Sequence, residues 1–244
     1  MSVCSHCGFE SEKTGACPLC GSLLVGSASE LAAPDALQGE SVPAWEDGHT
    51  PFPESLFRTW RHSVFRPTDF FACVPWDAAA VRPLLYYLVL AIVAAVFGLW
   101  WDVLGVGLTE WLIDPELRVW SETSPLMDFF VTPFAALISW AVWSGVLHLS
   151  VLILARGRRG FTATTRVVAY AAGPAAATIV PLAGPLVAFV GTVFLQILGI
   201  RAAHRTGTGR AAAIVLVPMA VMTMTIVAVT VIVVLALGFA MGGL

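Results

Sequence analysis

Residues 211–238 read AAAIVLVPMAVMTMTIVAVTVIVVLALG and carry no charged side chain. About 20 apolar residues in an α-helix are enough to cross the roughly 30 Å hydrocarbon core of a bilayer. Further apolar stretches lie near residues 83–105, 131–155, 166–182 and 184–201. The sequence therefore predicts an all-α membrane protein with five transmembrane helices, in a membrane domain of residues 83–238.

The composition of the whole chain supports this class. Hydrophobic residues make up 58% and charged residues 12% of the sequence, and the mean hydropathy is +0.83, which excludes an ordinary soluble domain of this length. The chain does not open with a basic region followed by a short apolar run, so we expect no cleaved signal peptide. The lipid bilayer is thus the first expected partner.

The third and fourth apolar stretches are short and are joined by Pro181-Leu182-Ala183-Gly184-Pro185. Because proline and glycine end one helix and begin the next, we expect a tight helical hairpin here. A re-entrant pair that does not fully cross the membrane is the alternative.

Charge placement predicts the orientation. Two loops are rich in arginine, whereas the loop between the first two spans is acidic; the arginines are Arg156, Arg158, Arg159, Arg166, Arg201, Arg205 and Arg210. By the positive-inside rule the N-terminus is cytoplasmic and the C-terminus lies outside. Lys13 is the only lysine among 13 basic residues, and Ala and Gly are abundant, which is typical of a bacterial source. We therefore expect a multi-pass protein of the bacterial cytoplasmic membrane.

Four cysteines at the start of the chain form two Cys-x-x-Cys pairs, Cys4 with Cys7 and Cys17 with Cys20. Two such pairs supply the tetrahedral set of four thiolates that zinc prefers, so residues 1–22 are predicted to be a zinc ribbon with one structural zinc ion. Spacing alone leaves open iron in a rubredoxin-like site, a redox dithiol or disulfides. No catalytic or further cofactor-binding residue is predicted.

Two segments separate this ribbon from the membrane domain. Residues 23–54 are acidic and rich in Ser, Ala, Gly and Pro, which predicts a flexible linker. Residues 55–82 form a juxtamembrane segment in which Leu56, Phe57, Trp60 and Val64 recur at helical spacing among basic side chains. This cytoplasmic amphipathic helix lies in the membrane interface or packs on the membrane domain as a cap.

The membrane domain offers few groups for chemistry. No Asp or Glu follows Asp128, so the last four predicted spans contain no carboxylate for a proton relay or ion site. His148 is expected to be neutral and hydrogen-bonded to a neighbouring helix, with a proton-sensitive switch as the alternative. Close helix packing is expected at four glycines, Gly173, Gly184, Gly191 and Gly199.

Several motifs resemble one family in order and spacing. Arg158–Tyr170, RRGFTATTRVVAY, resembles a cytoplasmic loop and the third-span entry of the Yip family, which is named for binding Ypt/Rab GTPases. The same resemblance is carried by Pro67-Thr68-Asp69-Phe70-Phe71, Arg82-Pro83, His148, Pro181 with Gly184, Leu198–His204, Thr206-Gly207 and Arg210-Ala211, and covers about residues 56–238. It implies five spans and, for eukaryotic members, a role in Golgi and endoplasmic-reticulum traffic through Rab binding and membrane shaping.

The leading hypothesis is a non-enzymatic membrane protein whose cytoplasmic zinc ribbon recruits a protein partner or whose bundle organises the bilayer. A transporter or channel for a small or lipidic solute, and a zinc or redox sensor, are the alternatives. Nucleic acid is not an expected partner, because residues 1–54 carry only Lys13 as a basic side chain against many acids. The sequence leaves open a homo-oligomer.

Overall fold

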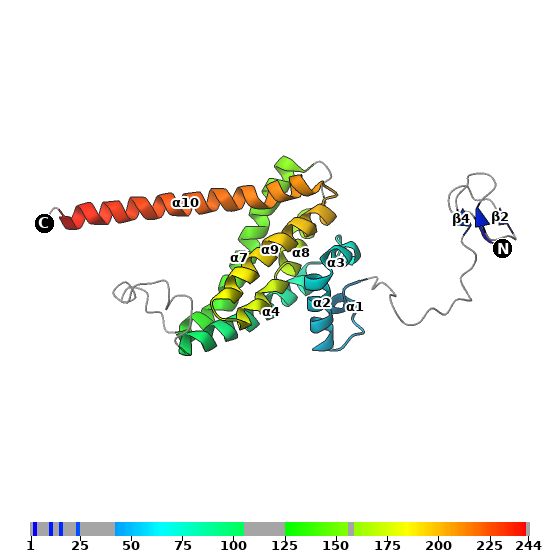
Figure 1. The fold of residues 1–244 in the computed structure, drawn as a ribbon, viewed down its shortest axis with the longest axis horizontal. Coiled ribbons are helices and arrows are strands. Elements are labelled where there is room, and N and C mark those ends of the chain that lie inside the picture. Colours follow the sequence, from blue (N-terminus) through cyan, green and yellow to red (C-terminus); the bar gives the residue numbers. More distant parts are fainter. Residues whose placement is uncertain are drawn as a thin grey trace. The chain divides into compact units, whose positions relative to one another are not determined.

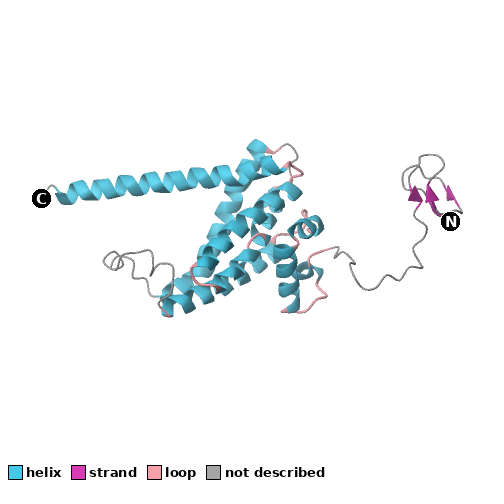
Figure 2. Ribbon diagram, in the orientation of Figure 1, coloured by secondary structure: helices cyan, strands magenta, loops and turns pink. Residues whose placement is uncertain are grey.

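The computed structural model describes residues 2–3, 10–11, 15–16, 23–24, 42–104, 125–155 and 159–242. The chain divides into two compact units, Met1–Glu40 and Ser41–Leu244. In the first unit, β1 (Ser2–Val3) pairs antiparallel with β2 (Glu10–Ser11), and β3 (Gly15–Ala16) pairs antiparallel with β4 (Leu23–Leu24) (Figure 2). The registers join Ser2 to Ser11 and Gly15 to Leu24.

The described part of the second unit is helical (Figure 1). In chain order its elements are α1 (Ala44–Asp47), α2 (Glu54–Phe65), α3 (Pro67–Cys73), α4 (Val81–Val103), α7 (Pro125–Leu154), α8 (Phe161–Tyr170), the 3-10 helix η1 (Gly173–Ile179), α9 (Ala183–Ala203) and α10 (Thr208–Gly242). Among the described residues, four helical stretches are long and apolar enough to cross a membrane: Val81–Val103, Phe129–Leu154, Ala183–Ala203 and Thr208–Ala236. The prediction of an all-helical, multi-pass membrane domain is therefore confirmed.

The third predicted stretch, residues 166–182, is not one continuous helix. It is divided into α8 and η1, because Gly173-Pro174 interrupts the α-helical pattern: proline lacks a backbone N–H and glycine disfavours a helix interior. At 1.5 Å per residue for α8 and about 2.0 Å for η1, the two pieces cover roughly 15 Å and roughly 14 Å. Together they are about as long as α9.

The predicted hairpin is present, since η1 and α9 lie side by side. At Gly184 a Cβ atom would lie only 2.2 Å from the carbonyl oxygen of Ala177, so glycine is required for this approach. Added Cβ atoms at Gly173, Gly191 and Gly199 would also come within 3 Å of neighbouring side chains, which confirms the predicted packing role of these glycines.

Helix α2 packs on the bundle through a stripe of small polar residues. Ser55, Thr59 and Ser63 recur every four residues and are buried, whereas Phe57 and Phe65 are 58% and 68% exposed. Small side chains allow the helix to approach the bundle closely, and the aromatic side chains are left on the outer face. This segment therefore packs on the helical bundle, and the burial of Phe70 and Phe71 in α3 extends the contact.

The predicted boundary of the flexible linker, residues 23–54, is wrong at its C-terminal end. The second unit begins at Ser41, and residues 44–47 form α1, with Ala44 buried. The reason is that Glu46, counted in the sequence as one of many solvated acids, has a buried basic partner in α8. Residues 25–41, the rest of the predicted linker, lie outside the described residues.

Candidate functional site

The four predicted metal ligands, Cys4, Cys7, Cys17 and Cys20, lie outside the described residues. Each Cys-x-x-Cys pair falls in the chain segment that joins two paired strands, β1 to β2 for the first pair and β3 to β4 for the second. Two antiparallel hairpins, each with one cysteine pair between its strands, are a suitable frame for a four-thiolate site. Elsewhere in the described part of the chain, no group of three or more His, Cys, Asp or Glu side chains could hold a metal ion.

A buried ion pair joins α1 to α8. The Arg166 side chain is fully buried and that of Glu46 is 7% exposed. Nη2 of Arg166 donates to both carboxylate oxygens of Glu46, at 2.6 Å for Oε2, and the Tyr170 hydroxyl donates to Oε1. Nη1 of Arg166 donates to the carbonyl oxygens of Ala78 and Ala79, at 3.3 and 2.7 Å. One guanidinium thus holds α1, the segment before α4, and α8 together.

The sequence did not reveal this cluster. From sequence, Arg166 belongs with the loop arginines that predict orientation, and Glu46 lies in the predicted linker. A signal was present in Trp45, a large aromatic residue inside an otherwise polar stretch. Its backbone N–H donates to Thr59 Oγ1 at 2.9 Å, and its indole N–H donates to the Arg82 carbonyl at 2.7 Å.

His148 is hydrogen-bonded to a neighbouring helix, as predicted. Its Nδ1 lies 3.0 Å from Thr164 Oγ1, and Thr164 Oγ1 lies 3.1 Å from Nε2 of His204, which caps the end of α9. The backbone N–H of Arg159 donates to Nδ1 of His204 at 3.2 Å. Burial, and then the nearby His148 and Arg159 side chains, lower the pKa of His204 to about 4. His204 is therefore neutral at pH 7 and accepts this backbone hydrogen bond.

Tryptophan side chains supply donors to the broken helix. The indole N–H of Trp60 donates to the Gly173 carbonyl at 2.9 Å, and that of Trp101 donates to the Thr178 carbonyl at 3.0 Å. These carbonyls lie at the two ends of η1, and Trp140 donates in the same way to the Thr165 carbonyl in α8 at 3.2 Å. Irregular backbone at membrane depth must be satisfied by such partners, because lipid offers none.

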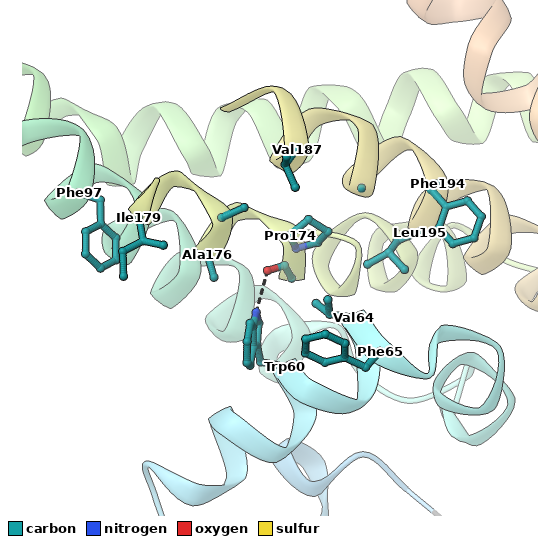
Figure 3. Close-up of a pocket in the computed structure, with 13 residues that line it drawn as sticks. Trp60, Val64, Phe65, Phe97, Pro174, Ala176, Ile179, Val187, Phe194 and Leu195 are labelled. Atoms are coloured by element: carbon teal, nitrogen blue, oxygen red, sulfur yellow. Dashed lines mark hydrogen bonds between the residues drawn. The ribbon is translucent and has the colours of Figure 1, made fainter. Parts of the chain in front are cut away.

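An apolar groove of about 540 Å³ lies beside η1 (Figure 3). Its walls come from four elements, α2, α4, η1 and α9, and include Trp60, Phe65, Phe97, Pro174, Ile179, Val187 and Phe194. Ile179, Val187 and Phe194 are more than half exposed, so the groove opens on the surface of the bundle. No charged residue lines it.

Comparison with protein families identifies the family of the helical domain. A model of the Yip1 domain matches residues 61–230, which is most of the chain. The chain belongs to the Yip1 domain family. This Yip1 domain begins within α2 and ends within α10, so the four strands and α1 with Glu46 lie before the matched residues. No curated protein and no solved structure matches the chain.

Proposed function

We propose that this Yip1 domain protein is a non-enzymatic membrane organiser that recruits a cytoplasmic protein partner through its N-terminal unit. The observation that carries the proposal is the division of the chain into a small unit with two cysteine-bearing hairpins and a helical membrane unit. The Glu46–Arg166 ion pair supports it, because it fastens the chain just before the Yip1 domain to the bundle. A partner bound by residues 1–24 is then held near one membrane face, since residues 25–41 extend at most roughly 60 Å.

The N-terminal unit is proposed to hold one structural zinc ion through Cys4, Cys7, Cys17 and Cys20. Each strand pair would present two thiolates, and zinc would supply most of the folding free energy of so small a unit. A reducing cytoplasm favours thiolate ligands over disulfides. Iron and a redox-sensing dithiol are the competing uses of the same four side chains.

The membrane domain is proposed to cross a bacterial cytoplasmic membrane five times, with α8 and η1 together as the third crossing. Their combined length of roughly 30 Å supports this, as does their position beside the full-length α9. The N-terminus is then cytoplasmic and the C-terminus outside, in agreement with the arginine-rich loops. Alkaline phosphatase fused after residue 242 should be active, and a fluorescent protein fused there should be dark. The opposite pair of results would mean four crossings.

The recruitment proposal is tested by comparing metal content and in-membrane crosslinking partners for the wild type and the Cys17→Ser/Cys20→Ser variant. We expect one zinc ion per wild-type chain, and loss of both the zinc and the crosslinked partner in the variant. Cys73→Ser is the matched control, because Cys73 lies in α3 and its thiol donates to the Asp69 carbonyl at 3.2 Å. Unchanged partners after loss of zinc would refute recruitment by the ribbon.

A further inference from the structure

We propose that the groove beside η1 binds one acyl chain of an anionic phospholipid whose phosphate is held by Arg61. This site is independent of the proposed zinc ribbon, and all of its lining residues except Trp60 lie within the Yip1 domain. It would make a specific lipid a structural part of the bundle, next to the broken helix.

The dimensions of the groove fit an acyl chain. Its lining follows η1 from Ile179 to Gly173, whose carbonyl accepts the hydrogen bond of Trp60, and continues past Gly173 to Leu195 and Phe194 of α9 (Figure 3). Seven residues of 3-10 helix extend about 14 Å, close to the roughly 15 Å of one leaflet of the hydrocarbon core. The lining is apolar throughout this length, so a hydrocarbon chain can enter without leaving any polar group of the lipid unsatisfied.

Arg61 is placed to bind a headgroup. It is exposed and lies four residues from both Phe57 and Phe65, so the three residues share the outer face of α2. Phe65 itself lines the groove. Arg58, one turn earlier, is paired with Glu54 at 3.1 Å, whereas Arg61 has no acidic partner in the described part of the chain. An exposed guanidinium one helical turn from Phe65, which lines the groove, is complementary to the phosphate of a lipid whose acyl chain lies in the groove.

The position of the groove favours a lipid over a protein segment. Phe97, Val187 and Phe194 belong to two of the helices that are long and apolar enough to span the membrane, α4 and α9. The open side of the groove therefore faces hydrocarbon, where lipid chains are present at high concentration. A second copy of the chain is the competing occupant.

The test uses the full chain in nanodiscs of phosphatidylcholine that contain a phosphatidylglycerol with a diazirine in one acyl chain. After irradiation, we expect saturable labelling of peptides from η1 and α9, and competition by unlabelled phosphatidylglycerol. Arg61→Gln should weaken this labelling about fivefold, as expected from the loss of one cation near anionic lipid. Arg58→Gln, whose side chain is already paired, should leave it unchanged.

Two groove variants separate lipid binding from misfolding. Ala176→Trp and Val187→Trp place a bulky side chain in the groove from η1 and from α9, and either variant that keeps the wild-type melting temperature should lose the saturable labelling. Non-saturable labelling equal to that of α10 peptides would overturn the proposal. Crosslinking of Val187 to Val187 between two chains, with no lipid label, would assign the groove to a second copy instead.

Discussion

The third and last apolar stretches of the chain differ in how far they are buried within the described bundle. In α8 every residue from Ala163 to Tyr170 is buried, including Arg166, and the chain continues as the 3-10 helix η1. In α10, Ala211, Ile214 and Val215 are buried near the start, whereas residues 220–236 are all exposed. Helix α8 is surrounded by protein, η1 is partly buried, and most of α10 is exposed.

The difference follows from where each backbone finds its hydrogen bonds. A continuous helix such as α10 satisfies its own N–H and C=O groups, so it needs only apolar side chains to lie in lipid. The interruption at Gly173-Pro174 removes part of that internal pairing, and Trp60 and Trp101 donate to carbonyls of η1 in its place. A broken helix must therefore be enclosed by partners. Substitutions should be much more harmful around α8 and η1 than in the outer part of α10.

The largest effect is expected from Arg166→Met. Removing one member of a buried ion pair leaves the Glu46 carboxylate unpaired and costs about 3–5 kcal/mol of unfolding free energy. The matched control is Arg58→Met, because Arg58 and Glu54 form a pair that is more than half exposed and worth about 0–1 kcal/mol. Thermal unfolding in detergent micelles measures both, and equal melting temperatures for the two variants would contradict the structural role of Arg166.

A smaller loss is expected from Gly184→Ala at the hairpin. The new Cβ would meet the backbone of Ala177 and Thr178, at 2.2 Å from the carbonyl oxygen and 2.9 Å from Cα, so η1 and α9 must separate. Overpacking of this kind costs about 1–3 kcal/mol. Gly145→Ala in α7 has nothing within 4 Å and should instead stabilise the helix by about 0.5–1 kcal/mol. Thermal unfolding should show a lower melting temperature for Gly184→Ala and a higher one for Gly145→Ala.

Trp101→Phe tests the hydrogen bonds that hold η1. The substitution keeps an aromatic ring but leaves the Thr178 carbonyl without its donor, at an expected cost of about 1–3 kcal/mol. Its neighbour Trp100 is 60% exposed, and Trp100→Phe should change the melting temperature little. Equal melting temperatures for the two variants would mean that lipid or water satisfies the Thr178 carbonyl. This end of η1 would then not depend on a protein donor.

The contact between α8 and His204 predicts a pH dependence. The pKa of His204 is about 4 in the folded chain and about 6.5 in an unfolded one, so the unfolded state binds more protons between these values. Stability should therefore fall as the pH is lowered from about 6.5 toward 4. His204→Gln should reduce the slope of melting temperature against pH between 6.5 and 5.

The parts of this architecture that the sequence predicted are those that depend on local pattern. Hydropathy located the long apolar helices, and Pro181 with Gly184 located the hairpin, because both signals lie within a single segment. The Glu46–Arg166 pair joins residues 120 positions apart, and no local pattern marks either as buried. In α2 the apolar spacing predicts an amphipathic helix, but it does not mark Ser55, Thr59 and Ser63, which are buried more completely than Leu56 and Trp60, because close approach favours small side chains over large ones. The role of the two cysteine pairs as zinc ligands stays a prediction.

The smallest effects are expected in the outer part of α10. Val229 and Ile232 are 54% and 65% exposed, so replacing either by alanine creates no cavity within the described bundle and should change the unfolding free energy by less than about 0.5 kcal/mol. The measurement is again thermal unfolding in micelles, at two protein concentrations. A large loss that depends on concentration would mean that this face packs against a second copy of the chain. Both helices would then be covered by protein, α8 by its own chain and the outer part of α10 by a second copy.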